Sequence, residues 1–355
     1  MLDKNFNKNL DILICDFFLK KEKLKFYKSD SIAFLDSSSS SLIENYILFL
    51  SKIFIKEMLY VSFNSKFERK VAHYTNVDVG MLLIREETKF RLSCTTTMND
   101  PQEGKQLYKF LNNILSTDRE VVNSKYYLSC FTFNHNSLNQ FRLYGRTNLI
   151  ECSGISLVFN KKFFFNNENL RAERLYRCIY IDPNSGYIQL ACRDKFTFIQ
   201  EEEGYNNNVE AKWFRYERMI EYKSIYLRNL LTLIRHISSQ YQVVEAQLNF
   251  IMGETKYLFK NFCFKDEQEC RIIKKSSIKD SKDSSCISSY LVYDGDFFNS
   301  LSNLYVGEAA YKLTSYIYKI ILNQPKFSVT PKIKISEHPY RAIEYLESIN
   351  GVEFT

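Results

Sequence analysis

From Val71 onward, the chain is a series of short runs rich in β-branched and aromatic residues, and several of them alternate apolar with polar positions. In chain order the runs are VAHYT, KFRLSCTTT, KYYLSCFTF, GISLVFN, LYRCIYI, CRIIKK, SYLVY, YKIILN and PKIKIS. Such runs predict strands. Between the fifth and sixth runs, residues 209 to 242 place apolar residues at helical spacing, which predicts a long helix, or a helical pair with residues 243 to 260. Many short strands with one helical insertion predict the α+β class.

The first 66 residues lack this strand texture and carry two helical patterns, one near Leu10 to Leu24 and one that starts after Ser37 to Ser41. Serine hydroxyls cap free N–H groups at a helix start, which supports the second pattern. We therefore expect a helical N-terminal segment over residues 1 to 66, one large domain over residues 67 to 345 and a C-terminal tail over residues 346 to 355. The polar run from residue 276 to residue 289 is typical of a loop between two strands.

Neither a membrane span nor a signal peptide is expected. The longest apolar stretch, Leu42 to Phe63, is interrupted by polar residues that are too costly for a bilayer span, so it predicts an amphipathic helix. These interruptions are Glu44, Asn45, Lys52, Lys56 and Glu57. The N-terminus holds only a short apolar run broken by Asp11 and Asp16, and no small-residue cleavage site follows it.

The nine cysteines are an odd number, and none forms the C-x-x-C pair that holds zinc or exchanges disulfides. Buried, reduced thiols are the simplest interpretation, which favours a compartment where thiols stay reduced. We expect a cytoplasmic protein, or one secreted into a host cell without a classical signal peptide. The many Phe, Tyr, Asn, Lys and Ile residues beside few Gly and Pro are typical of AT-rich genomes, which are common in host-associated bacteria.

A net charge of +7 favours phosphate-rich partners, because surface cations attract anions and release counterions from nucleic acid. Lys and Arg are nevertheless spread along the chain rather than clustered. A solvated basic surface is therefore the stronger interpretation, and nucleic acid stays the less favoured partner.

Several common catalytic motifs are missing from the sequence. It contains no G-x-G-x-x-G, P-loop, G-x-S-x-G or H-E-x-x-H pattern, which argues against a Rossmann dehydrogenase, a P-loop NTPase, an elbow-type α/β-hydrolase and a zincin. Metal sites built on paired histidines are not expected either, because the chain holds only four histidines. We expect no metal.

Four segments stand out together. They are His73-Tyr74-Thr75, then Asn99-Asp100-Pro101 followed by Glu103, then Ser129-Cys130-Phe131 with the helix-like run from Leu138 to Gly145, and finally Phe264 to Arg271. In this order and spacing they resemble the bacterial family known as domain of unknown function 2971, whose pattern runs H-Y-T, N-D-P-x-E, S-C-F with a helix bearing an aromatic residue, and E-x-E-x-R. The resemblance extends to Gly307 and to the closing run from Ser336 to Arg341, so it covers about three-quarters of the chain.

A more distant similarity to ADP-ribosyltransferases of the His-Tyr-Glu kind gives this pattern chemical content. That family places a histidine on the first core strand, a tyrosine on a helix after a middle strand and a glutamate at the start of a late strand. His73, Tyr144 and Glu269 follow the same order here. The resemblance implies a split, mixed or antiparallel sheet with a helical insertion, NAD as the substrate, and no metal.

The resemblance also implies roles for individual residues. His73, with its neighbours Tyr74 and Thr75, would contact a ribose hydroxyl of NAD, Tyr144 would stack on nicotinamide, and Glu269 would contact the nicotinamide ribose. Cleavage of the nicotinamide–ribose bond develops positive charge on the sugar, which a fixed carboxylate in a partly dry pocket stabilises. Arg142 and Gln140 are candidates for phosphate or amide contacts, since Arg pairs bidentately with phosphate oxygens.

Glu267 lies two positions before Glu269, hence on the same side of an extended chain, and an E-x-E pair of this kind orients the acceptor in some side-chain-directed transferases. The alternative interpretation of the run is a salt bridge at a strand edge, with Arg271 neutralising Glu269 on the same face. For His73 the alternative is a partly buried ring whose nitrogens are satisfied by backbone groups, and for Tyr144 it is a place in the core.

The segment Asn99-Asp100-Pro101 has a structural and a functional interpretation. Asx side chains bond their own backbone and Pro fixes the next turn, which predicts a stiff loop that begins a helix. The functional interpretation is a wall of the pocket.

The resemblance implies a mono-ADP-ribosyltransferase that consumes NAD and modifies a protein or, as a less favoured acceptor, a nucleic acid. Its expected role is that of a bacterial effector or toxin, with a host activating factor as a further partner. Two alternatives stay open. One is a non-catalytic module of the same fold that binds a nucleotide or a partner. The other is a protein that modifies or binds nucleic acid.

Overall fold

A computed structural model describes residues 39–62, 67–97, 100, 102, 104–111, 124–146, 150–164, 174–202, 208–240, 251–277 and 289–336. The chain divides into two units, Met1–Ile47 and Leu48–Thr355. Of the first unit, only the start of helix α2 (Ser39–Leu59) is described. The helix predicted near Leu10 to Leu24 and the C-terminal tail lie outside the described residues.

The second unit is built on a nine-stranded sheet with the order β10-β2-β3-β1-β4-β11-β12, to which β9 and β5 add at the free side of β3. Its strands are β1 (Lys70–Asn76), β2 (Arg91–Cys94), β3 (Ser124–Thr132), β4 (Gly154–Asn160), β5 (Leu175–Arg177), β9 (Glu269–Ser277), β10 (Tyr290–Val292), β11 (Leu301–Val306) and β12 (Lys332–Ile335). All pairs are antiparallel except β11 with β12. The predicted α+β class with a mixed sheet is confirmed.

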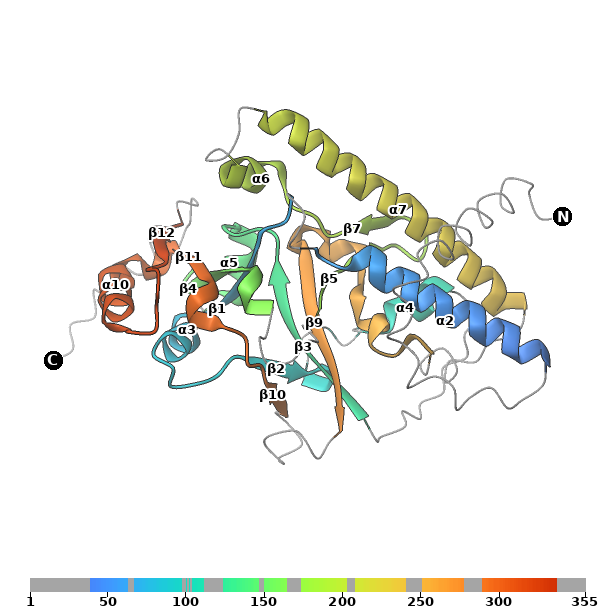
Figure 1. Ribbon diagram of the computed structural model, residues 1–355, viewed down its shortest axis with the longest axis horizontal. Helices are drawn as coiled ribbons and strands as arrows, with labels where there is room; N and C mark the ends of the chain where they lie inside the picture. Colours follow the sequence, from blue (N-terminus) through green and yellow to red (C-terminus); the bar gives the residue numbers. More distant parts are fainter. Residues whose placement is uncertain are drawn as a thin grey trace. The chain divides into compact units, whose positions relative to one another are not determined.

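Strand β3 is the point where this sheet branches. One edge pairs with β9 along its whole length, from Ser124 opposite Ser277 to Thr132 opposite Glu269. The other edge pairs with β2 only at Tyr127 and Leu128, and with β1 only at Thr132. In the described register, residues 129 to 131 therefore have no strand partner on this edge, because β1 and β2 diverge there (Figure 1).

Helices cover the sheet through two hydrophobic clusters. The larger cluster joins the strands to α3 (Val77–Ile84), α9 (Phe297–Ser300) and α10 (Thr314–Asn323). Gly80 lets α3 approach β4 closely, since a Cβ atom at this position would lie 2.0 Å from Ile155. The close approach fixes α3 over the region where β1 and β2 diverge.

The second cluster packs α4 (Gln106–Leu111), α6 (Lys195–Glu202) and the long α7 (Val209–Gln240) against a small separate sheet. That sheet has the order β7-β6-β8, with β7 (Ile188–Leu190), β6 (Ile179–Ile181) and β8 (Phe259–Asn261). Helix α7 confirms the long helix predicted over residues 209 to 242. Figure 1 shows it running beside α6 and β7.

Two secondary-structure predictions differ from the structure. The second helix predicted over residues 243 to 260 is only partly present: residues 251–252 are helical, but Gly253 at φ 48° starts a 3-10 helix (Gly253–Leu258) that leads directly into β8. The strand predicted over Tyr318 to Asn323 belongs to α10. Its buried residues Ile317 and Ile321 are four positions apart, which is helical spacing rather than alternation.

The remaining runs were partly correct. LYRCIYI is divided at Cys178 into β5 and β6, which belong to different sheets, and KFRLSCTTT forms a strand only over Arg91–Cys94. The polar loop predicted from residue 276 falls mostly on residues 278–288, outside the described residues. Among the described helices, none is long and apolar enough to cross a membrane.

Candidate functional site

A cavity of about 450 Å³ lies where β1 and β2 diverge from β3. Its lining includes six of the eight side chains that the sequence predicts for the site: His73, Tyr74, Gln140, Tyr144, Glu267 and Glu269. The structure thus brings residues from both halves of the chain to one place. The volume lies in the usual range for small-molecule sites, about 300–1,000 Å³.

Thr75 and Arg142, the other two predicted residues, do not line the cavity. Thr75 pairs with Ile155 in β4, and its methyl group faces Gly80 of α3. Arg142 projects from α5 (Leu138–Tyr144) toward solvent and forms an ion pair with Glu151, whose Oε2 is 3.5 Å from its Nε.

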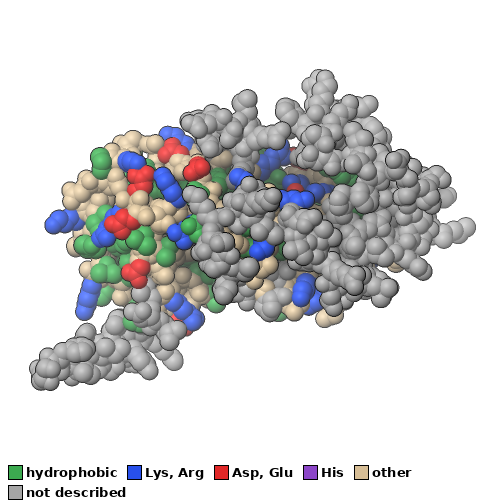
Figure 2. All heavy atoms as spheres, turned by 90° about the horizontal axis from the view of Figure 1, so that it is seen from below, with side chains coloured by type: hydrophobic (Ala, Val, Ile, Leu, Met, Phe, Trp, Pro, Cys, Tyr) green, Lys and Arg blue, Asp and Glu red, His purple; other side chains and the backbone are tan. Residues whose placement is uncertain are grey.

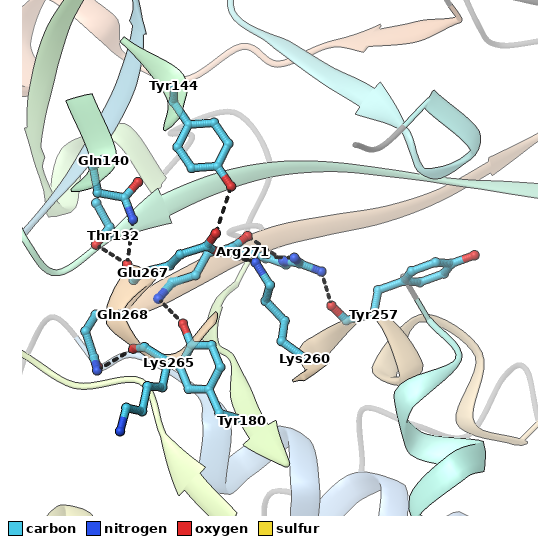
Figure 3. Close-up of polar contacts among 11 residues, drawn as sticks. Thr132, Gln140, Tyr144, Tyr180, Tyr257, Lys260, Lys265, Glu267, Gln268 and Arg271 are labelled. Carbon is cyan, nitrogen blue, oxygen red and sulfur yellow. Dashed lines mark hydrogen bonds and ion pairs between the residues drawn. The ribbon is translucent and has the colours of Figure 1, made fainter. Parts of the chain in front are cut away.

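Four ionisable side chains, which we call the cavity cluster, meet where Glu267 and Glu269 line the cavity: Lys260, Glu267, Glu269 and Arg271. Figure 3 labels Lys260, Glu267 and Arg271 of this cluster. The Lys260 ammonium donates to Glu267 and, at 2.5 Å, to Oε2 of Glu269. The Arg271 guanidinium donates from Nε to Oε1 of Glu269 at 2.6 Å. The salt bridge between Arg271 and Glu269, which was the structural alternative for this run, is therefore present.

The two carboxylates converge through a sharp turn. Glu267 ends a 3-10 helix (Phe262–Glu267), and Gln268 adopts a left-handed conformation with φ 45° and ψ 48° before β9 begins at Glu269. The extended backbone predicted between Glu267 and Glu269 was therefore wrong, although both side chains still point to Lys260.

The left-handed backbone of Gln268 is unfavourable for a residue other than Gly, and its side chain compensates through two hydrogen bonds. Its Oε1 accepts from the Cys192 amide at 2.6 Å, and its Nε2 donates to the Lys265 carbonyl at 2.7 Å. These contacts hold the turn that aims both carboxylates at one ammonium group.

The pKa values of the two carboxyl groups are shifted in opposite directions. Burial alone would raise the pKa of Glu269, but the Arg271 guanidinium and the Lys260 ammonium outweigh it, so the pKa falls well below its ordinary value. Burial raises the pKa of Glu267, and the neighbouring Glu269 charge adds to this, against the opposing effect of Lys260. Glu269 is thus the fixed anion of the cluster, and Glu267 is the carboxyl group that gains a proton more readily.

Helix α5 connects the cluster to the opposite wall. The Tyr144 hydroxyl donates to Oε1 of Glu267 at 3.1 Å, while the side chain stays 40% exposed. Burial and the Glu267 charge raise the pKa of Tyr144, so it remains a neutral donor. Gln140 is buried, and its Nε2 donates to the Glu267 carbonyl at 3.1 Å, so its amide fixes the turn.

The His73 ring, on β1, contacts the backbone of β3 across the gap between the two strands. Its Nδ1 lies 2.8 Å from the carbonyl oxygen of Cys130, and its edge meets Phe90 with ring centroids 4.9 Å apart. Burial lowers the pKa of His73, so the ring is neutral, and a proton on Nδ1 leaves Nε2 as an acceptor. Within the described residues Nε2 has no hydrogen-bond partner, so the backbone-satisfied alternative holds for one nitrogen only.

Tyr74 holds the start of α5 in place. Its hydroxyl donates to the carbonyl of Asn134 at 2.9 Å and accepts from the amide of Ser137 at 2.8 Å, which fixes the residue that precedes α5. Its ring packs edge-on against Phe141. Tyr74 therefore positions α5, which carries Tyr144.

The other motif residues have structural contacts. Oδ1 of Asp100 accepts from the amide of Gln102 at 2.8 Å, as the stiff-loop interpretation predicts, and Asp100 does not line the cavity. Asn99, Pro101 and Glu103 lie outside the described residues. A Cβ atom at Gly307 would lie 2.1 Å from the Cys152 carbonyl oxygen, so a larger residue would displace this backbone.

Lys260 and Cys130 were not among the predicted site residues, although Cys130 belongs to the segment Ser129-Cys130-Phe131. Lys260 lies in a stretch that resembled a helix, and its short strand β8 carries it to the carboxylates. The Cys130 thiol lines the cavity, donates to Glu269, and has its pKa raised by burial and by that carboxylate. The Lys260 position depends on a chain reversal that no local pattern signals.

A second buried ion pair, which we call the interior cluster, does not line the cavity. It consists of Glu68, Arg177 and Tyr216. Nη2 of Arg177 donates to both carboxylate oxygens of Glu68 at 2.5 and 2.6 Å, and the Tyr216 hydroxyl donates to Oε1 at 2.9 Å. The cluster ties α7 and β5 to the segment before β1.

Comparison of the chain with protein-family models, with curated proteins and with solved structures finds no match.

Among the described residues, no three His, Cys, Asp or Glu side chains are grouped as metal ligands would be. On the face seen in Figure 2, Lys and Arg side chains are dispersed among acidic and apolar ones.

Proposed function

We propose that the chain is a mono-ADP-ribosyltransferase that consumes NAD, that it belongs to the family of domain of unknown function 2971, and that the cavity takes the nicotinamide–ribose end of NAD. The observation that carries the proposal is the meeting of His73, Tyr144, Glu267 and Glu269 in one cavity. The resemblance assigned roles to His73, Tyr144 and Glu269 from their order in the chain, and the E-x-E pair assigned one to Glu267. Their convergence is a geometric condition that residue order does not guarantee.

The binding roles follow from the geometry. The partly exposed ring of Tyr144 offers an aromatic face to nicotinamide, while its hydroxyl is held by Glu267. Nε2 of His73 offers an acceptor for a ribose hydroxyl, because Nδ1 already donates to Cys130. Both side chains are held by neighbours, so little ordering is needed when the substrate binds.

The chemical roles follow from the pKa difference between the two acids. When the bond between C1 of the ribose and the nicotinamide nitrogen breaks, its electron pair leaves with nicotinamide and the sugar becomes cationic. Glu269, which stays ionised, stabilises this cation. The acceptor then forms a bond to C1 and loses a proton to Glu267, whose pKa is raised above its ordinary value, which makes it a better proton acceptor.

The test is to incubate the protein with labelled NAD and with bacterial or eukaryotic lysates, and to measure nicotinamide release and transfer of label to protein. Glu269→Gln is expected to lower nicotinamide release about 100-fold or more, as removal of a transition-state charge partner does. Glu254→Gln is the matched control, because Glu254 is also a carboxylate paired with two lysines, Lys52 and Lys56, and does not line the cavity. The proposal fails if wild type releases no nicotinamide and transfers no label, or if Glu269→Gln is as active as wild type.

A second candidate function is nucleotide binding without turnover. The observation that favours it is the charge balance of the cavity cluster, where two carboxylates face two cations and both oxygens of Glu269 are already in ion pairs. A neutralised carboxylate stabilises a developing cation less. Calorimetry separates the two functions: heat of binding with NAD that remains intact afterwards supports the second, and nicotinamide release supports the first.

A further inference from the structure

The cavity has a basic side as well as the wall that carries the carboxylates. Thr88, Lys89, Arg91 and Ser93, from the start of β2 and the turn before it, all contribute to the lining. Along β2, Arg91 and Ser93 are exposed while Leu92 and Cys94 are buried. The strand alternation therefore presents Arg91 and Ser93 on one face.

The sheet register places this face toward the carboxylates. Ser93 lies opposite Leu128, so continuation of the register brings Arg91 opposite Cys130, at the point where β2 and β3 diverge. On the other edge of β3, Cys130 lies opposite Arg271 and Thr132 lies opposite Glu269. Paired residues share a face, so Arg91 borders the cavity on the same face of the sheet as Glu269.

Arg91 is held in a fixed orientation without a counter-ion from the described residues. Its guanidinium lies 4.2 Å above the ring centroid of Tyr290, and its Nη2 donates to Oγ1 of Thr88 at 3.1 Å. Lys89, in contrast, pairs with Oε1 of Glu86 at 3.1 Å. In the part of the chain that the structure describes, no carboxylate pairs with Arg91, so several of its donors remain for an anion.

We propose that Arg91 binds a phosphate group of the ligand, with Lys89 and the hydroxyls of Thr88 and Ser93 around it. A planar guanidinium pairs bidentately with phosphate oxygens, and stacking on Tyr290 pre-organises it for this contact. A ligand that places a sugar near the carboxylates and a phosphate at Arg91 is a ribosyl phosphate or a nucleotide. The inference rests on the proposed function for the position of the sugar, and it adds the group that selects phosphorylated ligands.

The test compares nicotinamide riboside with nicotinamide mononucleotide, which differ by one phosphate group, by calorimetry on the full chain. Wild type is expected to bind the mononucleotide more tightly. Arg91→Gln is expected to weaken mononucleotide binding about tenfold or more, as loss of a charge-assisted pair does, and to leave riboside binding unchanged. The affinity of Arg91→Lys for the mononucleotide should lie between those of wild type and Arg91→Gln, since lysine keeps the charge and loses the bidentate geometry.

Arg218→Gln is the matched control, because Arg218 is another exposed arginine above aromatic rings, 5.4 Å from the Tyr222 centroid, and does not line the cavity. If Arg91→Gln weakens both ligands equally, if Arg218→Gln has the same effect, or if wild type binds neither ligand, the phosphate site is overturned. Mononucleotide binding that depends on Arg91, in a protein that releases no nicotinamide from NAD, supports the phosphate site and rejects the transferase. Nicotinamide release with an unchanged KM for NAD in Arg91→Gln supports the transferase and rejects the phosphate site.

Discussion

The interior cluster and the cavity cluster are both buried groups of ion pairs, yet they differ in charge balance and in access. The interior cluster has one acid and one base, and the side chains of Arg177 and Glu68 are 0% and 2% exposed. The cavity cluster has two acids and two bases and lies against a cavity. In the first, one guanidinium donates to both oxygens of one carboxylate. In the second, two carboxylates share one ammonium group.

The difference in charge balance and access decides where acid–base chemistry is possible in the molecule. In the interior cluster, burial alone would lower the pKa of Arg177, but Glu68 outweighs it and raises that pKa, which keeps the guanidinium charged. In the cavity cluster the pKa of Glu269 is lowered and that of Glu267 is raised. A pair of similar groups whose pKa values are moved apart is the arrangement that acid–base chemistry requires.

The largest effect is expected from Arg177→Met in the interior cluster. The substitution removes the guanidinium that donates to both oxygens of the buried Glu68 carboxylate, which costs about 3–5 kcal/mol of unfolding free energy. Urea denaturation followed by circular dichroism measures the loss. The double variant Glu68→Gln with Arg177→Met should recover a large part of it, because it buries no unpaired charge. A loss below about 1 kcal/mol in the single variant would show that the interior cluster contributes little to the stability of the fold.

Lys260→Met in the cavity cluster is expected to cost less, about 1–3 kcal/mol, because Glu269 keeps Arg271 and Glu267 can take up a proton. The loss of unfolding free energy should grow with pH. At higher pH, Glu267 must either ionise beside Glu269 or stay protonated although the proton concentration is low. Denaturation at pH 5 and pH 8 measures this. A cost that is equal at both pH values, or as large as that of Arg177→Met, would remove the distinction between the clusters.

The order and element types of the site could be predicted from the sequence, because they depend on local patterns. Alternation identified β1 around His73 and β9 after Glu269, and the short helical run that carries Tyr144 is confirmed as α5. These patterns report on neighbours in sequence. They do not report which strands diverge, so the cavity could be expected only from the resemblance.

The convergence on Lys260 could not be predicted, for two physical reasons. The stretch before Lys260 has apolar residues at spacings that fit a helix, while pairing with β6 makes residues 259 to 261 a strand. The turn at Gln268 needs a positive φ, which Gly or Asn would have signalled and Gln does not. Its conformation is set by Cys192 and Lys265, and Cys192 is distant in sequence.

Glu267→Gln is expected to change the pH dependence of stability by a smaller amount. The folded pKa of Glu267 lies above its ordinary value of 4.5, so the folded state holds this proton while the unfolded state loses it. Wild type should therefore lose stability relative to Glu267→Gln as the pH rises above 4.5 and through the folded pKa. Glu269, with its lowered pKa, contributes stability above pH 4.5 that is lost as the pH falls.

Unfolding free energies of wild type and Glu267→Gln at a series of pH values, at constant ionic strength, measure the difference. Glu254→Gln is the control of opposite sign, because the pKa of Glu254 is lowered to about 2: burial alone would raise it, but Lys52 and Lys56 outweigh that effect. Wild type should lose its advantage over Glu254→Gln as the pH falls from 4.5 toward 2. If the Glu267 difference falls with decreasing pH like that of Glu254, Glu267 belongs with the fixed anions and the proposed proton acceptor is wrong.

The smallest effect on stability is expected from Tyr144→Phe, which removes the hydrogen bond to Glu267 and keeps the ring. The loss should be about 0.5–1.5 kcal/mol, since the hydroxyl lies at a partly exposed side chain. Binding of nicotinamide riboside should hardly change in Tyr144→Phe, whereas Tyr144→Ala should weaken it about tenfold, because aromatic contact is lost. Calorimetry of both variants separates the ring from the hydroxyl. Equal weakening in both would assign the binding to the hydroxyl and to its link with the cavity cluster, and the ring would then have no part in holding nicotinamide.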